Sequence, residues 1–321
     1  MDQEHSHAVD GAPLVSVIVP VCDTKPYLPR CLDSLLAQTL ERIEVVVIDD
    51  GSTDGSGALV DEYAARDGRV RVVHGRRAGA AAARNRGIEI ARAPRLMFVD
   101  SDDWVEPDFC LHAHQAAEEH RCDLVYFMHR RVFGDGRVET VKAPRPAGLA
   151  SEADALFVSD HVAVTVWSML CDQRLFDEVR FPEGRLGEDM GTTHRLVHAA
   201  RRIWLLDEAP YHYTFGREGS AWNTLSERLV DDSFDMGRLR IDDLEEWGYD
   251  VIYQEQLLAT FYLVHRGRVG GRGEESHRLA RESGPISREL EPALRRMLRL
   301  YRACPWLFDC VCKLSGRRLR G

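Results

Sequence analysis

The amino-acid sequence predicts an α/β protein with a mostly parallel sheet, followed by a helical C-terminal region. Four runs of β-branched and other apolar residues alternate with segments of helical periodicity. The runs are apolar almost throughout, as expected of strands that helices cover on both faces. The four runs are Val15–Val21, Ile43–Asp50, Val70–His74 and Arg95–Asp100.

Three segments between these runs predict helices, at Tyr27–Gln38, Gly57–Ala65 and Ala80–Ala91. In the first of them apolar residues recur at helical spacing. Parallel strands joined by helices require right-handed connections, and ligands of such sheets bind beyond the carboxyl ends of the strands. The residues that follow the four strands are therefore the first candidates for a functional site.

Beyond about residue 108 the alternation becomes irregular. The stretch "CDLVYFMHRRVFGDGRVET" predicts a strand and a hairpin, and "WSMLCDQRLFDEVRFPEGRLGEDMGTTHRLVHAA" predicts a short strand, a helix, a loop and a second helix. After Trp222 the pattern is mostly helical, for example at Leu225–Trp247 and Tyr253–Gly267, with a Gly- and Arg-rich break at "GRVGGRGEES" that predicts a mobile link. We expect a disordered tail, an α/β domain in two halves and a helical region. These are residues 1–13, 14–222 (halves 14–108 and 109–222) and 223–321.

Composition excludes several classes of protein. The chain has 321 residues, 44% of them hydrophobic, and a formal net charge of −10, which argues against a nucleic-acid-binding protein. Its eight cysteines form no CxxC pair and no zinc-like spacing, so we expect reduced thiols. The N-terminus has no apolar segment of the signal-peptide kind, and no apolar run approaches the roughly 18 residues of a membrane span. These features predict a cytoplasmic protein.

The last thirty residues differ from the rest in charge. Residues 292–321 carry eight Arg and Lys against Asp309 alone, interleaved with apolar side chains. A basic amphipathic segment can lie on an anionic membrane surface, which predicts peripheral contact with the inner face of the membrane. A basic helix that packs on its own acidic domain is an equally good interpretation.

Acidic residues follow three of the four predicted strands. An acidic rim repels phosphate, so either a divalent cation mediates binding or the acids contact uncharged parts of the ligand. The pattern therefore predicts a Mn²⁺ or Mg²⁺ site at this edge of the sheet. The acids are Asp23, Asp49, Asp50, Asp100, Asp102 and Asp103.

A series of motifs runs in order from Leu14 to Trp222: "VSVIVPVCD", "CLDSLLAQT", "EVVVIDDGSTDGS", "AARNRGI", "FVDSDDWVEP", "FPEGRLGEDM", and "YHY" followed by Arg and Ser. Together the motifs resemble the family 2 glycosyltransferases with the GT-A fold, a Rossmann-like fold of nucleotide-diphospho-sugar transferases. The resemblance implies an inverting glycosyltransferase that moves a sugar from a nucleotide diphosphate donor, with UDP as the expected nucleotide. The acceptor would be a hydroxyl of a glycan or lipid-linked molecule in exopolysaccharide, capsule or cell-wall synthesis.

The resemblance also assigns donor-binding residues. Asp50 would accept a hydrogen bond from the base, Asp100 would face the ribose or sugar, and Asp102 would coordinate the metal between the phosphates. Arg217 would offset the charge of the diphosphate, and His212 would add a metal ligand. The other residues placed at the donor are Pro20, Val21, Asp23, Arg84 and Ser101.

Several of these acids have structural alternatives. Asp49 can hold the turn after its strand, and Ser52 or Asp54 can cap the following helix. Asp103 can likewise cap the helix that follows it. Each of these alternatives would remove the residue from the ligand site.

Single displacement by a sugar hydroxyl requires a base opposite the leaving group. The resemblance places it in "GEDM", as Asp189, with Glu188 as second choice. Adjacent carboxylates perturb one another, and one of them can acquire a useful pKa. We expect the two acids to open the helix that follows the loop "PEGRLG". The structural alternative is therefore that they are favoured at a helix N-terminus by its dipole.

The chain departs from the family pattern at three places. Cys22 and Asp23 stand where tyrosine and asparagine are usual, and Arg77 starts a loop that more often begins with asparagine and two glycines.

Two tryptophans, Trp167 and Trp222, could stack on a sugar or belong to the core.

Two other functions compete with glycosyl transfer. A nucleotidyltransferase generally needs a glycine-rich basic loop after its first strand, and "PVCDTKPYLPR" has no glycine. A non-catalytic nucleotide-sugar-binding or scaffold protein could keep the strand-end acids but would need no base. Retention of Glu188, Asp189 and Arg217 weighs mildly against it.

Overall fold

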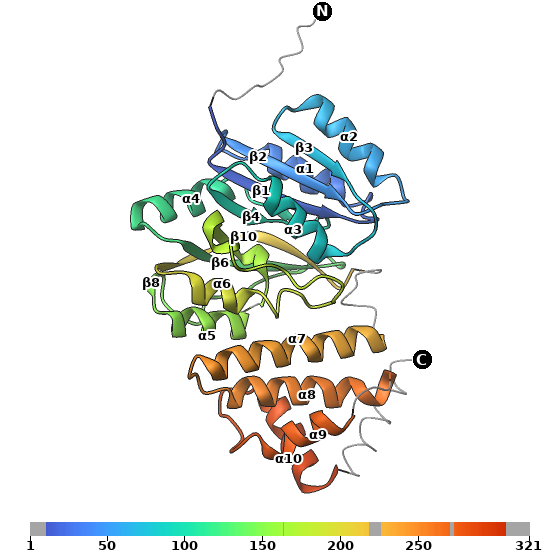
Figure 1. Ribbon diagram of the computed structural model, residues 1–321, viewed down its shortest axis with the longest axis vertical. Coiled ribbons are helices and arrows are strands. Elements are labelled where there is room, and N and C mark those ends of the chain that lie inside the picture. The colour runs from blue at the N-terminus through green and yellow to red at the C-terminus, as the bar shows by residue number, and fades with distance from the viewer. Residues whose placement is uncertain (1–10, 163, 218–225, 270–272, 306–321) are drawn as a thin grey trace, which may run out of the picture. The chain divides into compact units, whose positions relative to one another are not determined.

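The computed structural model (Figure 1) describes residues 11–162, 164–217, 226–269 and 273–305. The chain divides into two compact units, residues 1–217 and 218–321. All the described strands lie in the first unit, and the described part of the second contains helices. The division falls after Arg217, close to the domain end expected at residue 222.

The α/β prediction is confirmed, since the first unit is built on a sheet with the order β3-β2-β1-β4-β9-β6-β10-β5, with β7 paired to β6 and β8 to β10. Strands β3, β2, β1 and β4 pair with one another in parallel, as predicted. Beyond them the sheet is mixed, because β9 runs antiparallel between β4 and β6 while β10 is parallel to β6. The strands are β1 Val15–Val21, β2 Ile43–Asp49, β3 Val70–His74, β4 Arg95–Phe98, β5 Trp104–Val105, β6 Leu124–Phe133, β7 Val138–Thr140, β8 Gly148–Ala150, β9 Met169–Asp172 and β10 Ile203–Phe215.

The helices of this unit include the three that the sequence predicts between the first four strands. They are α1 Leu28–Leu36, α2 Ser56–Arg66, α3 Ala80–Ile90, α4 Phe109–His120, α5 Glu152–Val162 and α6 Thr193–Ala199, with short 3-10 turns η1 Val166–Ser168 and η2 Gln173–Phe176.

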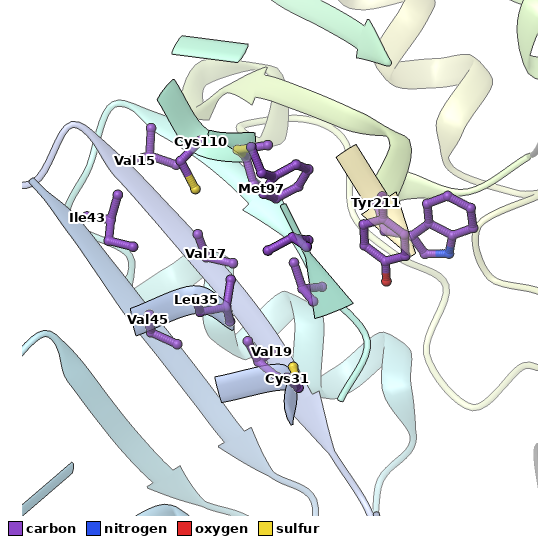
Figure 2. Packing of buried hydrophobic residues seen from close by; sticks show 14 of the residues in the cluster. Val15, Val17, Val19, Cys31, Leu35, Ile43, Val45, Met97, Cys110 and Tyr211 are labelled. Carbon is purple, nitrogen blue, oxygen red and sulfur yellow. The ribbon is translucent and has the colours of Figure 1, made fainter. Parts of the chain in front are cut away.

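Strand β1 lies between β2 and β4 in the sheet, and every one of its branched side chains is buried. Figure 2 shows Val15, Val17 and Val19 of β1 beside Ile43 and Val45 of β2. Leu35 and Cys31 of α1 cover the same layer. Valine and isoleucine suit a pleated surface covered on both faces, and this layer holds the carboxyl ends of β1, β2 and β4 in fixed register.

Helix α3 packs against β1 through a glycine. A Cβ on Gly87 would overlap Cγ2 of Ile18, so the helix approaches the sheet as closely as its backbone allows. We predict that Gly87→Ala lowers the free energy of unfolding by up to about 2 kcal/mol, since overpacking costs about 1–3 kcal/mol and helix propensity returns about 1 kcal/mol.

Urea unfolding would measure the effect of Gly87→Ala. The matched control is Gly68→Ala, because a Cβ on Gly68 meets nothing within 4 Å. Equal unfolding midpoints for the two variants would contradict the close approach of α3 to β1.

The irregular middle of the chain differs from its prediction in two places. The helix expected after β9 is only the turn η2, and the second helix, α6, begins at Thr193. The hairpin prediction is confirmed, because β6 and β7 pair as antiparallel strands around Asp135 and Gly136.

The described part of the second unit contains four helices, α7 Glu227–Glu246, α8 Ile252–Val269, α9 Gly273–Glu282 and α10 Pro292–Ala303. They share an apolar core that includes Phe234 and Tyr262. The predicted mobile link is helical up to Val269 and from Gly273, and residues 270–272 lie outside the described residues. Of the basic tail, only the part in and just after α10 is described.

No helix in the described ranges is both long enough and apolar enough to cross a membrane.

Candidate active site

The acids after β4 are held by β10. The hydroxyl of Tyr211 accepts from the amide of Asp100 at 3.1 Å and donates to Oδ2 of Asp103 at 2.7 Å. The amide of Thr214 donates to the other oxygen of Asp103 at 2.7 Å, and the Thr214 hydroxyl donates to the carbonyl of Asp102 at 2.6 Å. Asp103 is 1% exposed, and burial raises the pKa of its carboxyl. Its interpretation as a helix cap is wrong, because Asp103 fastens β10 to the acidic loop.

The guanidinium of Arg84 connects the acidic loop to the predicted base. Its Nη2 lies 2.7 Å from Oδ1 of Asp100, its Nη1 pairs with Oε1 of Glu188, and the same Nη1 lies 3.8 Å from Oδ1 of Asp189. The Arg84 side chain is only 5% exposed. A buried arginine among three carboxylates offsets their mutual repulsion, which would otherwise force some of them to be protonated.

Asp189 has the properties of a general base. Its Oδ2 accepts from the amide of Val166 at 3.3 Å, while its Oδ1 is buried without a hydrogen-bond partner. Burial raises the pKa of Asp189 to about 7, with Glu188 and Asp100 adding to the rise and Arg84 opposing it. A base with a pKa near neutrality and one unsatisfied oxygen suits proton removal from a hydroxyl.

Glu188 and Asp189 precede α6 instead of opening it. The helix begins at Thr193, and the main-chain carbonyl of Asp189 accepts the amide of that residue at 2.9 Å. The Glu188 carboxylate is paired with Arg84. Stabilisation by a helix dipole therefore does not account for these two acids, since the effect falls off within the first turn.

The loop that carries the two acids is anchored to α3. Asn85 donates from Nδ2 to the carbonyl of Phe181 at 2.9 Å and to Oε1 of Glu183 at 3.0 Å, and its Oδ1 accepts the amide of Phe181 at 3.0 Å. Gly184 and Gly187 take φ values of 73° and 76°, which favour glycine. Adjacent residues of α3 thus hold both the start of this loop and its acids.

Asp50 organises the loop before α3. Its two carboxylate oxygens accept the amides of Ala78 and Gly79, each at 2.7 Å, and its own amide donates to the carbonyl of Val21 at 2.8 Å. The sequence signal for this role, an aspartate at a strand end, is the one that suggested a contact with the base. That contact stays a prediction.

In the turn after β2, Asp49 and Asp54 take the structural roles that the sequence suggested for them, whereas Ser52 does not. Asp49 accepts the amide of Ser52 at 3.0 Å, so it holds the turn as predicted. Asp54 accepts the amide of Ser56, the first residue of α2, at 2.9 Å. Ser52 does not cap this helix.

Two of the departures from the family pattern contact each other. Asp23 forms an ion pair with Arg77 and accepts the amide of Thr53 at 2.7 Å. The amide of Asp23 donates to the Ser52 hydroxyl at 3.1 Å. Asp23 takes a φ of 52°, a left-handed conformation that aspartate tolerates better than most residues. These contacts tie the loop after β1 to the loops after β2 and β3.

The remaining residues assigned to the donor lie near the same edge. Pro20 and Val21 end β1, and the carbonyl of Val21 accepts the amide of Asp50. Ser101 is buried, and its hydroxyl lies 2.8 Å from that of Thr24. Their contacts with a donor stay predictions.

Asp102 and Arg217 are paired. The Nε of Arg217 lies 2.6 Å from Oδ2 of Asp102, and its guanidinium lies 5.2 Å from the centre of the Tyr27 ring. Burial and the charge of Asp100 raise the pKa of Asp102. Since Arg84 pairs with Asp100, two arginines face the three carboxylates of the acidic loop and offset their charge only in part.

The chemistry of this loop fits a divalent cation. Carboxylate oxygens are the ligands that Mg²⁺ and Mn²⁺ prefer, and a cation would lower the raised pKa of Asp102. Within the described ranges, no three His, Cys, Asp or Glu side chains converge as a ready-made metal site. Mg²⁺ is usually held by one or two carboxylates together with substrate phosphates and water, so Asp102 is the residue that would hold it.

His212 belongs to a separate cluster. Its Nε2 lies 2.9 Å from Oε1 of Glu106, which also pairs with Arg130, and its ring stacks on Trp104 with centroids 4.8 Å apart. Burial lowers the pKa of His212. Metal ligation by His212 would compete with the bond to Glu106, and it stays a prediction.

The core alternative for Trp167 is confirmed, whereas sequence reasoning missed the role of Tyr211. Trp167 is 4% exposed and stacks on Tyr211 with centroids 4.4 Å apart, so it belongs to the core. Tyr211 positions both Asp100 and Asp103, and its only signal in the sequence is its place in the motif "YHY". Trp222 lies outside the described residues.

Comparison with known proteins assigns the chain to a family. A family model described as "Glycosyl transferase family 2" matches residues 16–171. Glycosyltransferase GlyG of Streptococcus pneumoniae is 34% identical over 228 residues, which are 66% of this chain and 73% of GlyG. The chain belongs to glycosyltransferase family 2.

Two further proteins are similar to a larger part of this chain. Glycosyltransferase GlyA of S. pneumoniae is 30% identical over 260 residues, which cover 77% of this chain but only 36% of GlyA. The crystal structure of S. aureus TarS 1-349 in complex with UDP-GlcNAc has a TM-score of 0.68 at 23% identity, covering 95% of this chain and 91% of that one. This likeness confirms the GT-A fold of a family 2 glycosyltransferase.

Proposed function

We propose that this chain is a metal-dependent inverting glycosyltransferase that moves a sugar from a UDP-sugar to a hydroxyl of a glycan or lipid-linked acceptor. The observation that carries the proposal is the linkage, through Arg84, of the acid Asp100 to the pair Glu188 and Asp189. This linkage connects the loop that is expected to face the donor with Asp189, a carboxylate that can accept a proton. A scaffold protein would have no use for this arrangement.

In this mechanism Asp189 removes the proton of the acceptor hydroxyl as the hydroxyl attacks the anomeric carbon from the side opposite the diphosphate. Arg84 keeps Glu188 and Asp100 in place. Arg217 exchanges Asp102 for a phosphate oxygen when the donor binds. A cation at Asp102 would stabilise charge on the departing diphosphate.

The test is release of free UDP from a panel of UDP-sugars with Mn²⁺ and a panel of glycan acceptors. UDP release that requires both sugar nucleotide and acceptor supports the proposal. Binding of UDP without release in any combination favours the scaffold alternative. A role in exopolysaccharide, capsule or cell-wall synthesis would follow from which acceptor is used.

Removal of Asp102 should separate metal binding from nucleotide binding. In wild type we expect Mn²⁺ to increase the stabilisation by UDP in a thermal-shift experiment, because a ligand stabilises the state it binds. We expect Asp102→Ala to remove this Mn²⁺-dependent increase. Asp207→Ala, which changes an exposed acid in β10, should keep it. An undiminished Mn²⁺ effect in Asp102→Ala would mean that other residues hold the metal.

Peripheral membrane contact through residues 292–321 in a cytoplasmic enzyme is also part of the proposal. It rests on the basic amphipathic pattern of the sequence. Sedimentation with anionic liposomes is the measurement that decides it.

A further inference from the structure

A row of aromatic side chains leads from the candidate base to the surface. Val166, whose amide binds Asp189, precedes Trp167. The ring of Trp167 stacks on Tyr213 with centroids 5.7 Å apart, and Tyr213 meets Phe215 edge-on at 6.1 Å. The row therefore begins beside the group that must meet the acceptor hydroxyl.

The row keeps to one face of the sheet. In the parallel pairing of β6 and β10, Tyr213 lies opposite Arg131 and Phe215 opposite Phe133. Side chains two apart along a strand share a face, so the four side chains form one surface. The rings of Phe133 and Phe215 are 4.9 Å apart. We call Arg131, Phe133, Tyr213 and Phe215 the aromatic platform.

The outer end of the platform is exposed. Phe215 is 42% exposed, one of three large apolar residues in the described ranges noted for high exposure. Burying it against a ligand would remove apolar surface from water, whereas leaving it free has no structural benefit. Phe215 is thus an exposed ring at the outer end of a row that starts next to the candidate base, a position that suits the binding of a ligand.

The positive charge of Arg131 is a second feature of the aromatic platform. The guanidinium of Arg131 lies 5.9 Å from the centre of the Phe215 ring, and within the described residues it has no ion pair. The nearby Arg137 is paired with Glu139 and lies over Phe133. Arg131 is therefore the cation at this end that can bind a hydroxyl or an anionic group of a ligand.

We propose that the aromatic platform is a binding site for the glycan chain of the acceptor, with a sugar ring stacked on Phe215 and a polar or anionic substituent held by Arg131. The C–H face of a pyranose packs on the negative face of an aromatic ring. A chain bound along the platform would extend from the hydroxyl at Asp189 out to solvent. This proposal rests on the proposed function, since it gives that function its acceptor subsite.

The experiment is saturation-transfer NMR on the full chain with four probes. Two are neutral, cellohexaose and chitohexaose, and two are anionic, a chondroitin hexasaccharide and poly(ribitol phosphate). We expect at least one probe to receive saturation, and Phe215→Ala to weaken its binding by about five- to tenfold, the size of one lost aromatic contact. Phe215→Trp should retain binding, while Phe215→Leu, which keeps an apolar side chain without a ring, should not.

Arg131→Gln distinguishes the two halves of the site, because it should weaken the anionic probes more than the neutral ones, whose hydroxyls the glutamine amide can still bind. The matched control is Leu149→Ala, since Leu149 is 59% exposed and pairs with Trp204 near the opposite end of β10. It should bind like wild type.

Failure of all four probes to receive saturation, or equal binding by Phe215→Ala and wild type, would overturn the proposal. Binding of UDP with Mn²⁺, measured on the same samples, keeps this outcome separate from the proposed function. If UDP binds and no glycan does, the platform is wrong and the donor site stands. If glycans bind and UDP does not, the platform stands as a glycan site and the proposed function is wrong.

Discussion

Asp189→Asn is expected to stop sugar transfer without loss of UDP binding. Asparagine has the shape of aspartate but cannot accept a proton at neutral pH. A positioned general base contributes about 10²–10⁴-fold to the rate, so we expect a loss of that size in kcat. UDP affinity should be unchanged, because Asp189 faces Arg84 and Val166 and its role is confined to the acceptor hydroxyl. Free UDP release and isothermal titration with UDP measure the two quantities.

Glu188→Gln is the matched control. It changes the neighbouring acid, whose carboxylate is occupied by an ion pair with Arg84. We expect a smaller loss of activity, from the weakened ion pair alone. Full activity of Asp189→Asn together with an inactive Glu188→Gln would reverse the assignment of the base.

The pH dependence provides an independent check on the same residue. Burial raises the pKa of Asp189 to about 7, and only the ionised carboxylate can accept a proton. Activity should therefore rise with pH through that value, reaching about half its maximum at pH 7 and about a tenth at pH 6. A limb near pH 4 in kcat/KM would indicate a base with an ordinary carboxylate pKa.

The sequence predicted the parallel strands well because each is specified locally. A run rich in β-branched residues such as Val15–Val21 is buried wherever helices cover both faces, so β1 follows from the local sequence alone. The acids after β4 follow from the same argument, since strand ends meet at one edge. Fold and acidic edge were therefore predictable before any contact was known.

The role of Asp103 was not predictable in this way. Its partners, Tyr211 and Thr214, lie more than a hundred residues later in the chain. A local pattern favours a helix cap for an aspartate before a turn, and tertiary hydrogen bonds override it. The start of α6 was misplaced for a related reason, because the loop before it has no hydrophobic periodicity and is fixed by Asn85.

Arg84 could be predicted as a site residue but not as the link between acids. Nothing in "AARNRGI" shows that one guanidinium meets Asp100 and Glu188, which are far apart in the chain. The geometry makes Arg84 a positioning residue, because its side chain is buried and occupied by carboxylates. This leads to the second large expected effect.

Arg84→Gln should destabilise the first unit and also shift its pH profile. Removal of one partner from a buried ion pair costs about 3–5 kcal/mol, because the remaining charges lose compensation. The matched control is Arg86→Gln on the same helix, since Arg86 is 54% exposed and pairs with Glu89. Exposed pairs contribute about 0–1 kcal/mol, so this variant should unfold at nearly the wild-type urea concentration.

The shift of the pH profile separates electrostatic positioning from simple support of the fold. The charge of Arg84 lowers the pKa of Asp189 against the effect of burial. Without that charge the pKa rises further, so the activity that remains in Arg84→Gln should require a higher pH than in wild type. Arg84→Lys keeps a positive charge but cannot bridge two carboxylates as a planar guanidinium does, so its pH profile should lie between the two. An unshifted profile in Arg84→Gln would mean that Arg84 stabilises the loop without setting the protonation of the base.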